Sequence, residues 1–182
     1  WFQVDGAYGG LFILSDLVRN RLKGFERADS VILNAHKALF TPFGLAVVLV
    51  RDGQLLQRAH FHTANYLQDT LLEEDEVSPA DLGPELTRNF RGPRLWLPLK
   101  LLGVAPFRAA LSEKILLTRY AYEKVKSLSG FEVGPYPDLT VFAFRYVPAT
   151  GDADDFNRRL VDAIRKDGTI LLSSTTLDGR YM

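Results

Sequence analysis

Two residues of the chain combine reactive side chains with positions at the ends of strand-like segments. Lys37 comes soon after the apolar residues 30–34, and Asp5 follows the alternating residues 1–4. A lysine on an apolar run is costly unless its desolvation serves a purpose, because burial disfavours the ammonium form and leaves an amine that attacks carbonyl carbon. The alternative interpretation is a strand-end lysine that extends its amine into solvent.

The pattern between these two residues predicts how they are brought together. Residues 11–23 repeat apolar side chains at helical spacing, between a strand at residues 1–4 and a second strand at residues 30–35. A strand, a helix and a strand in succession imply a parallel pair with a right-handed crossover, so both carboxyl ends lie at one edge of the sheet. Ligands of open α/β sheets bind at that edge. We therefore expect Asp5 and Lys37 to belong to one binding site.

A carboxylate and a lysine beside a turn of small residues suit pyridoxal phosphate as the cofactor. The turn after Asp5 contains Gly6, Ala7, Gly9 and Gly10. The lysine would form a Schiff base with the cofactor aldehyde, and the aspartate would hold the pyridine nitrogen protonated. Opposite unit charges about 4 Å apart attract by roughly 4 kcal/mol at an effective dielectric near 20, which equals about three pKa units. Such an interaction is large enough to keep the ring cationic.

Three motifs in this order resemble a known family. VDGAYGG at residues 4–10 and LNAHK at residues 33–37 are similar to the active-site signature of the group II pyridoxal-phosphate decarboxylases, whose form is Asp-x-Ala-Tyr-x-Gly and then Asn-x-His-Lys. Residues 86–104 resemble the helix after that family's mobile loop, and residues 172–182 resemble a strand pair of its small domain. The family includes aromatic-amino-acid, histidine, glutamate and diaminobutyrate decarboxylases. The resemblance covers essentially the whole chain.

The resemblance implies a fold, a reaction and a set of site residues. The fold is α/β, part of the large domain of a fold-type I, aspartate-aminotransferase-like enzyme. Lys37 would be the aldimine lysine and Asp5 the partner of the pyridinium. Ala7 would pack against the cofactor ring, Asn34 would bind its phosphate, and His36 would shape the pocket. The reaction would be decarboxylation of an L-amino acid to its amine and carbon dioxide by a homodimer.

Residues 68–85 form the least regular part of the chain. They carry seven acidic residues, no basic residue and two prolines, which is typical of a solvated, flexible loop. By resemblance this segment is the active-site loop that closes over the substrate. Leu82 stands where many relatives have a tyrosine that protonates the substrate carbon, and leucine cannot donate a proton.

The leucine leaves three alternatives open. His62, Tyr66 or water could supply the proton in its place. Without a donor, dioxygen could intercept the carbanion, so that the protein is an oxidative, aldehyde-forming relative. The third alternative is a catalytically inactive relative that is retained for its dimer surface.

The remaining pattern predicts two domains. Residues 45–50 read as a strand buried on both faces, and helices are expected at residues 92–102 and 105–128, separated by Gly103. Ser129 and Gly130 mark a boundary, so residues 1–128 would belong to the large domain and residues 129–182 to the start of a small one. In that part we expect strands at residues 131–133, 139–147 and 169–175 and a helix at residues 152–167.

Composition narrows the class of protein. The chain has 182 residues, of which 47% are hydrophobic and 24% charged, and its formal net charge is zero. Zero net charge argues against nucleic acid or an anionic membrane as the main partner. His60 and His62 form a pair, but no third ligand is near them, so no metal is expected. No signal peptide and no long apolar run is apparent, so a cytoplasmic location is expected, and both ends of the chain interrupt strand patterns, as in a fragment.

Overall fold

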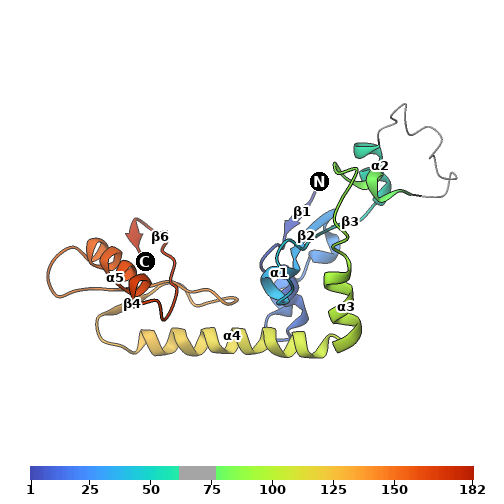
Figure 1. The fold of residues 1–182 in the computed structure, drawn as a ribbon. Coiled ribbons are helices and arrows are strands. Elements are labelled where there is room, and N and C mark those ends of the chain that lie inside the picture. The colour runs from blue at the N-terminus through green and yellow to red at the C-terminus, as the bar shows by residue number, and fades with distance from the viewer. Residues whose placement is uncertain (62–76) are drawn as a thin grey trace. The chain divides into compact units, whose positions relative to one another are not determined.

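The chain folds into two compact units, residues 1–108 and 109–182, in a computed structural model that describes residues 1–61 and 77–182 (Figure 1). The division falls inside helix α4 (Ala105–Lys126), whereas the sequence predicted a domain boundary after residue 128. The later part of α4 packs on the segment that follows it, since the hydroxyl of Tyr122 donates a hydrogen bond of 3.2 Å to the carbonyl of Gly134. Most of the helix, from residue 109 onward, therefore groups with the second unit.

The first unit contains a three-stranded sheet in the order β1-β2-β3. Strand β1 (Gln3–Asp5) runs parallel to β2 (Ser30–Asn34), with Asp5 opposite Ile32. Strand β3 (Ala46–Val50) runs antiparallel to β2. The parallel β1–β2 pair confirms the prediction that the carboxyl ends of these two strands share one edge of the sheet.

The connection between β1 and β2 differs from the predicted helix at residues 11–23. It consists of three short 3₁₀ segments, η1 (Gly10–Leu14), η2 (Arg19–Leu22) and η3 (Phe25–Arg27). Ser15 ends η1 in an extended conformation, with φ −89° and ψ 126°. Serine and aspartate compete for backbone hydrogen bonds and disfavour helix interiors, so the break at Ser15 and Asp16 overrides the apolar spacing. The spacing still selects the core, because Phe12 and Val18 are buried.

The prediction that the third strand is buried on both faces is wrong for the described chain. Val48 and Leu49 of β3 are 58% and 53% exposed. Strand β3 lies at the edge of the sheet and pairs only with β2 among the described residues. A continuous apolar run therefore indicated strand formation here but not two covered faces.

Helices follow the sheet in the first unit. Helix α2 (Gly53–His60) is capped by Asp52, whose carboxylate accepts the N–H of Gln54 at 3.0 Å. The 3₁₀ segment η5 (Pro79–Leu82) packs against α2. Helix α3 (Pro93–Leu102) ends at Gly103 with a φ of 73°, as the sequence predicted.

The second unit packs helix α5 (Ala153–Asp167) on two small antiparallel pairs. Strand β4 (Phe131–Val133) pairs with β5 (Phe144–Tyr146), and β6 (Thr176–Leu177) pairs with β7 (Arg180–Tyr181). The side chain of Asn157 on α5 is buried and forms hydrogen bonds to both the N–H and the carbonyl of Tyr146 in β5. It accepts the N–H of Tyr146 at 2.9 Å and donates to the carbonyl of the same residue at 2.7 Å.

Sequence patterns located the helix of this unit better than its strands. The predicted helix at residues 152–167 is confirmed, with the Asp152 side chain as its N-cap. The predicted strand at residues 139–147 shortens to β5, and the strand expected at residues 169–175 is replaced by the β6–β7 hairpin. Asp178 and Gly179 have positive φ values of 48° and 76°, as a two-residue hairpin turn requires. This turn fixes the pairing of Leu177 in β6 with Arg180 in β7. None of the described helices combines the length and apolarity that a bilayer crossing requires.

Candidate active site

The backbone of Ala7 joins the ends of the two parallel strands. Its N–H donates to the Asp5 Oδ1 at 3.0 Å, and its carbonyl accepts the N–H of Asn34 at 3.2 Å. Asp5 is the last residue of β1 and Asn34 the last residue of β2. The structure therefore brings three of the predicted site residues together at the carboxyl edge of the sheet, and it fixes one oxygen of the Asp5 carboxylate.

The small residues of the intervening turn allow this close approach. A Cβ atom on Gly6 would lie 2.9 Å from the carbonyl oxygen of Ile32, and one on Gly10 would lie 2.4 Å from a methyl group of Leu33. The turn is closed by a hydrogen bond of 2.8 Å from the Gly10 N–H to the Gly6 carbonyl. At Gly6 a side chain would meet the backbone of β2, which cannot give way, whereas at Gly10 a methyl group would require the Leu33 side chain to move.

Lys37 lies in a one-turn helix, α1 (Ala35–Ala38), that begins where β2 ends. The sequence placed it at the strand end itself, so the lysine is displaced by part of a helical turn. Its side chain is exposed, and among the described residues it makes no hydrogen bond or ion pair. The desolvation predicted for this amine is therefore not provided by the described residues.

His36 is held on both sides by the turn after α1. Its Nδ1 lies 2.9 Å from the carbonyl oxygen of Leu45, and its ring meets the ring of Phe43 edge-on at 5.1 Å. His36 is half-buried, and its neighbours in α1, Ala35 and Ala38, are buried. These contacts orient the helical turn that carries Lys37.

Thr41 contributes a polar group that the sequence analysis did not single out. Its hydroxyl is buried four residues after Lys37 and has no hydrogen-bond partner among the described residues. Buried hydroxyls are normally paired, so this oxygen marks a place where the described chain leaves hydrogen-bonding capacity unused. No composition or spacing pattern distinguishes it from the other threonines.

The residues at this edge fit the chemistry of pyridoxal phosphate. That cofactor requires an amine for its aldehyde and a carboxylate for its ring nitrogen. Lys37, in the helical turn after β2, offers the amine, and the oriented carboxylate of Asp5 at the end of β1 offers the carboxylate. The described residues contain no cluster of three or more His, Cys, Asp or Glu side chains able to hold a metal, and His62 lies outside them.

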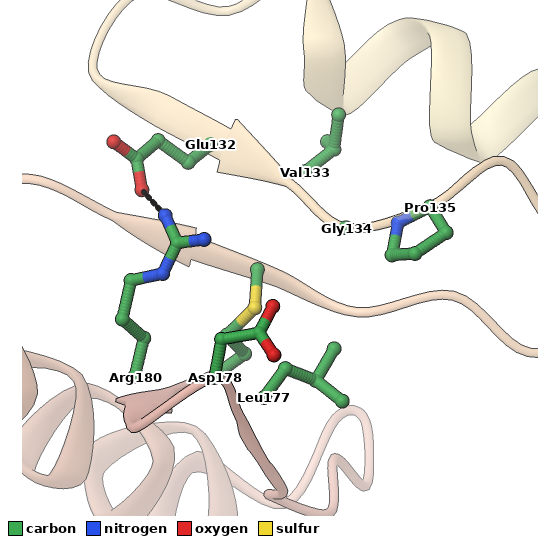
Figure 2. Close-up of a pocket in the computed structure, with 8 residues that line it drawn as sticks. Glu132, Val133, Gly134, Pro135, Leu177, Asp178 and Arg180 are labelled. Atoms are coloured by element: carbon green, nitrogen blue, oxygen red, sulfur yellow. Dashed lines mark ion pairs between the residues drawn. The ribbon is translucent and has the colours of Figure 1, made fainter.

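A separate hollow of about 270 Å³ lies in the second unit (Figure 2). Its lining comes from the end of β4 and from the β6–β7 hairpin, namely Glu132, Val133, Gly134, Pro135, Leu177, Asp178, Arg180 and Met182. Arg180 and Glu132 face each other across it at 3.7 Å, and Glu132 also pairs with Arg145 at 2.8 Å. None of the residues predicted for the cofactor site lines this hollow.

The fold is part of a fold-type I α/β domain. Residues 1–147 match the pyridoxal-dependent decarboxylase conserved domain, and the chain belongs to this family. The crystal structure of Oryza sativa TDC with PLP and tryptamine superimposes with a TM-score of 0.90 at 28% identity, over 100% of this chain and 39% of that one.

Two curated relatives illustrate the range of the similarity. An aromatic-L-amino-acid decarboxylase of Bacillus atrophaeus is 35% identical over 97% of this chain and 38% of its own length. A phenylacetaldehyde synthase of Arabidopsis thaliana is 29% identical over 100% of this chain and 38% of its own length. The chain therefore spans less than half of the relatives that it matches.

Proposed function

We propose that the protein carrying this chain decarboxylates an L-amino acid, with Lys37 and Asp5 as its catalytic residues. The observation that supports this most strongly is the chain of hydrogen bonds from Asp5 through Ala7 to Asn34, beside the helical turn of Lys37. Pyridoxal phosphate, when bound, supplies an aldehyde that couples to amines and a ring that accepts the electron pair released as carbon dioxide leaves. In this proposal Lys37 would hold the cofactor, and Asp5 would keep its ring nitrogen protonated.

Lys37 acts through its amine. Its Nζ would hold the cofactor covalently and, once the substrate amine has taken its place, would be free to accept or return a proton. The exposed position of Lys37 in the described chain allows the side chain to reach a cofactor above the sheet edge. The contacts of His36 restrain the single turn of α1 from which this side chain extends.

Asp5 acts through its charge. Its Oδ1 accepts the Ala7 N–H, so the carboxylate is oriented and its second oxygen is available for the ring nitrogen. At about 4 Å and an effective dielectric near 20, such a charge favours protonation of that nitrogen by roughly 4 kcal/mol. A protonated ring withdraws electrons more strongly from the reacting carbon.

The other three predicted residues complete the site in this proposal. Ala7 presents a small surface on which the ring packs, and Asn34 binds the phosphate from the end of β2. His36 forms part of the pocket wall, in an orientation fixed by Leu45 and Phe43. Residues 1–128 would be the later part of the large domain, with residues 68–85 as its mobile loop, and residues 129–182 would begin the small domain.

A second candidate is an aldehyde-forming reaction on the same cofactor. Leu82 at the end of η5 cannot donate a proton, and one relative of similar coverage is named a phenylacetaldehyde synthase. The loop residues 68–76, together with His62 and Tyr66, lie outside the described residues.

Product analysis tests both candidates and also the alternative of an inactive relative. The longest natural protein containing this chain would be loaded with pyridoxal phosphate and given aromatic and then acidic L-amino acids. We expect equal amounts of amine and carbon dioxide. Aldehyde with peroxide would favour the second candidate, and an absence of any turnover with every substrate would contradict both.

A further inference from the structure

Arg94 connects helix α3 to the turn that follows Lys37. It lies in the first turn of α3, and its Nη1 donates a hydrogen bond of 3.1 Å to the carbonyl oxygen of Phe43. The two residues are 51 positions apart in the sequence.

The turn that Arg94 contacts has an unusual backbone on both sides of the hydrogen bond. Phe40 has a φ of 56° and Gly44 a φ of 87°. A large side chain in the left-handed region is strained, and such strain persists only where the surrounding structure fixes it. The carbonyl of Phe43 lies between these two positions. The hydrogen bond from Arg94 therefore restrains the backbone at the place where its conformation is strained.

The same turn sets the position of His36. The ring of Phe43 meets the His36 ring at 5.1 Å with an angle of 62° between their planes, and the carbonyl of Leu45 lies 2.9 Å from His36 Nδ1. His36 and Lys37 share the single turn of α1. A shift of the Phe43 backbone is therefore transmitted to the histidine next to the lysine.

We propose that Arg94 is a positioning residue for the Lys37 site. It acts through Phe43 and His36 and contacts neither the lysine nor the cofactor. This proposal rests on the function proposed above, because it assigns Arg94 a role toward the same cofactor. A guanidinium is suited to the task, since it stays charged at all relevant pH values and its planar donors hold a fixed direction.

The experiment compares matched variants in the longest natural protein that contains this chain. Arg94→Met keeps the aliphatic stem and removes every donor. Lys100→Met removes a positive charge from the same helix, at an exposed residue of the last turn of α3. Arg94→Lys retains a donor group, so its amide exchange rate and its dissociation constant for pyridoxal phosphate should lie between those of the wild type and of Arg94→Met.

The first readout is amide hydrogen exchange of Leu39 in the apoprotein, because its N–H donates to the Ala35 carbonyl immediately before the turn. We expect Arg94→Met to raise the exchange rate of this amide about three- to tenfold, the effect of losing one exposed, charge-assisted hydrogen bond. The second readout is the dissociation constant of pyridoxal phosphate, from titration of the apoprotein. It should rise by a similar factor, whereas Lys100→Met should change neither quantity.

Two results would overturn the proposal. If Arg94→Met matches Lys100→Met in exchange, the hydrogen bond does not hold the turn. If exchange rises but the dissociation constant does not, the contact supports the fold without positioning the site. Failure of the proposed function is recognised separately, because Lys37→Ala would then bind the cofactor as well as the wild type does, whatever the exchange of the turn.

Discussion

At the scale of single residues, the site depends on a backbone group as much as on its side chains. The N–H of Ala7 orients the Asp5 carboxylate, and the carbonyl of the same residue holds the end of β2. A substitution at Asp5 that keeps the oxygen acceptor but removes the charge can therefore test the role of the charge without losing the hydrogen bond to Ala7.

Asp5→Asn is such a substitution. The amide oxygen can still accept the Ala7 N–H, so the turn should persist and the cofactor should still bind. Loss of roughly 4 kcal/mol of charge interaction corresponds to a decrease in kcat of about a thousandfold. Cofactor absorbance and kcat, measured on the same preparation, check this, and a kcat within a few-fold of wild type would contradict the role of Asp5.

The glycines of the turn have a role in stability that can be measured independently of activity. Gly10→Ala would place a methyl group 2.4 Å from Leu33 and 3.3 Å from the ring of Phe25. Overpacking of this kind typically costs 1–3 kcal/mol, so we expect the free energy of unfolding to fall by about that amount.

Gly53→Ala is the matched control for that measurement. A Cβ there would meet no atom within 4 Å, and Gly53 begins helix α2. Urea unfolding should show this variant to be as stable as the wild type or more so by up to about 1 kcal/mol. Equal destabilisation by the two substitutions would show that the Gly10 contact is not limiting.

At the scale of secondary-structure elements, local signals predicted helix boundaries, whereas the apolar spacing of residues 11–23 did not predict the type of element found there. Gly103 and the Asp152 cap ended or began helices as expected. The parallel pair was predicted from the order of segments, but the crossover is made of 3₁₀ turns because Ser15 and Asp16 interrupt the helix.

Part of the site could be predicted from the order of the strands, and part could not. Asp5, Ala7 and Asn34 could be placed at one edge because parallel strands bring their carboxyl ends together. The contacts of Arg94 and the unpaired hydroxyl of Thr41 could not be predicted. Both depend on how the turn after Lys37 packs on residues that are distant in the sequence. Such contacts produce no periodic pattern of residue types.

The loop before α3 carries the prediction about product. If the protein forms an amine, Tyr66→Phe should lower the amine-to-aldehyde ratio by about 10²-fold, the usual contribution of a positioned acid. Leu82→Tyr should then have no effect, because a proton donor already acts in the wild type. If the wild type forms aldehyde, Leu82→Tyr should instead raise the ratio. Chromatography of the products distinguishes these cases, and a ratio unchanged in both variants would exclude both residues as the site of protonation.

At the scale of the whole molecule, the chain belongs to the pyridoxal-dependent decarboxylase family and spans 38% of its Bacillus atrophaeus relative. Several large apolar side chains of α3 remain exposed, including Trp96 at 62% and Leu101 at 72%. Exposed apolar surface of this kind is typical of protein–protein interfaces.

We expect the complete protein to be a homodimer. Two-fold assemblies are the commonest oligomers, and the family resemblance implies a site completed across such an interface. Sedimentation velocity at micromolar concentration should give the mass of two chains. A fully active monomer at that concentration would contradict the expectation.

The central claim is that Lys37 binds the cofactor covalently, and reduction followed by peptide mapping tests it most directly. The longest natural protein containing this chain would be incubated with pyridoxal phosphate, treated with borohydride and digested for mass spectrometry. We predict that the reduced cofactor is attached to Lys37 and that Lys37→Ala carries none. Attachment to another lysine, or equal labelling of the variant and the wild type, would contradict the account.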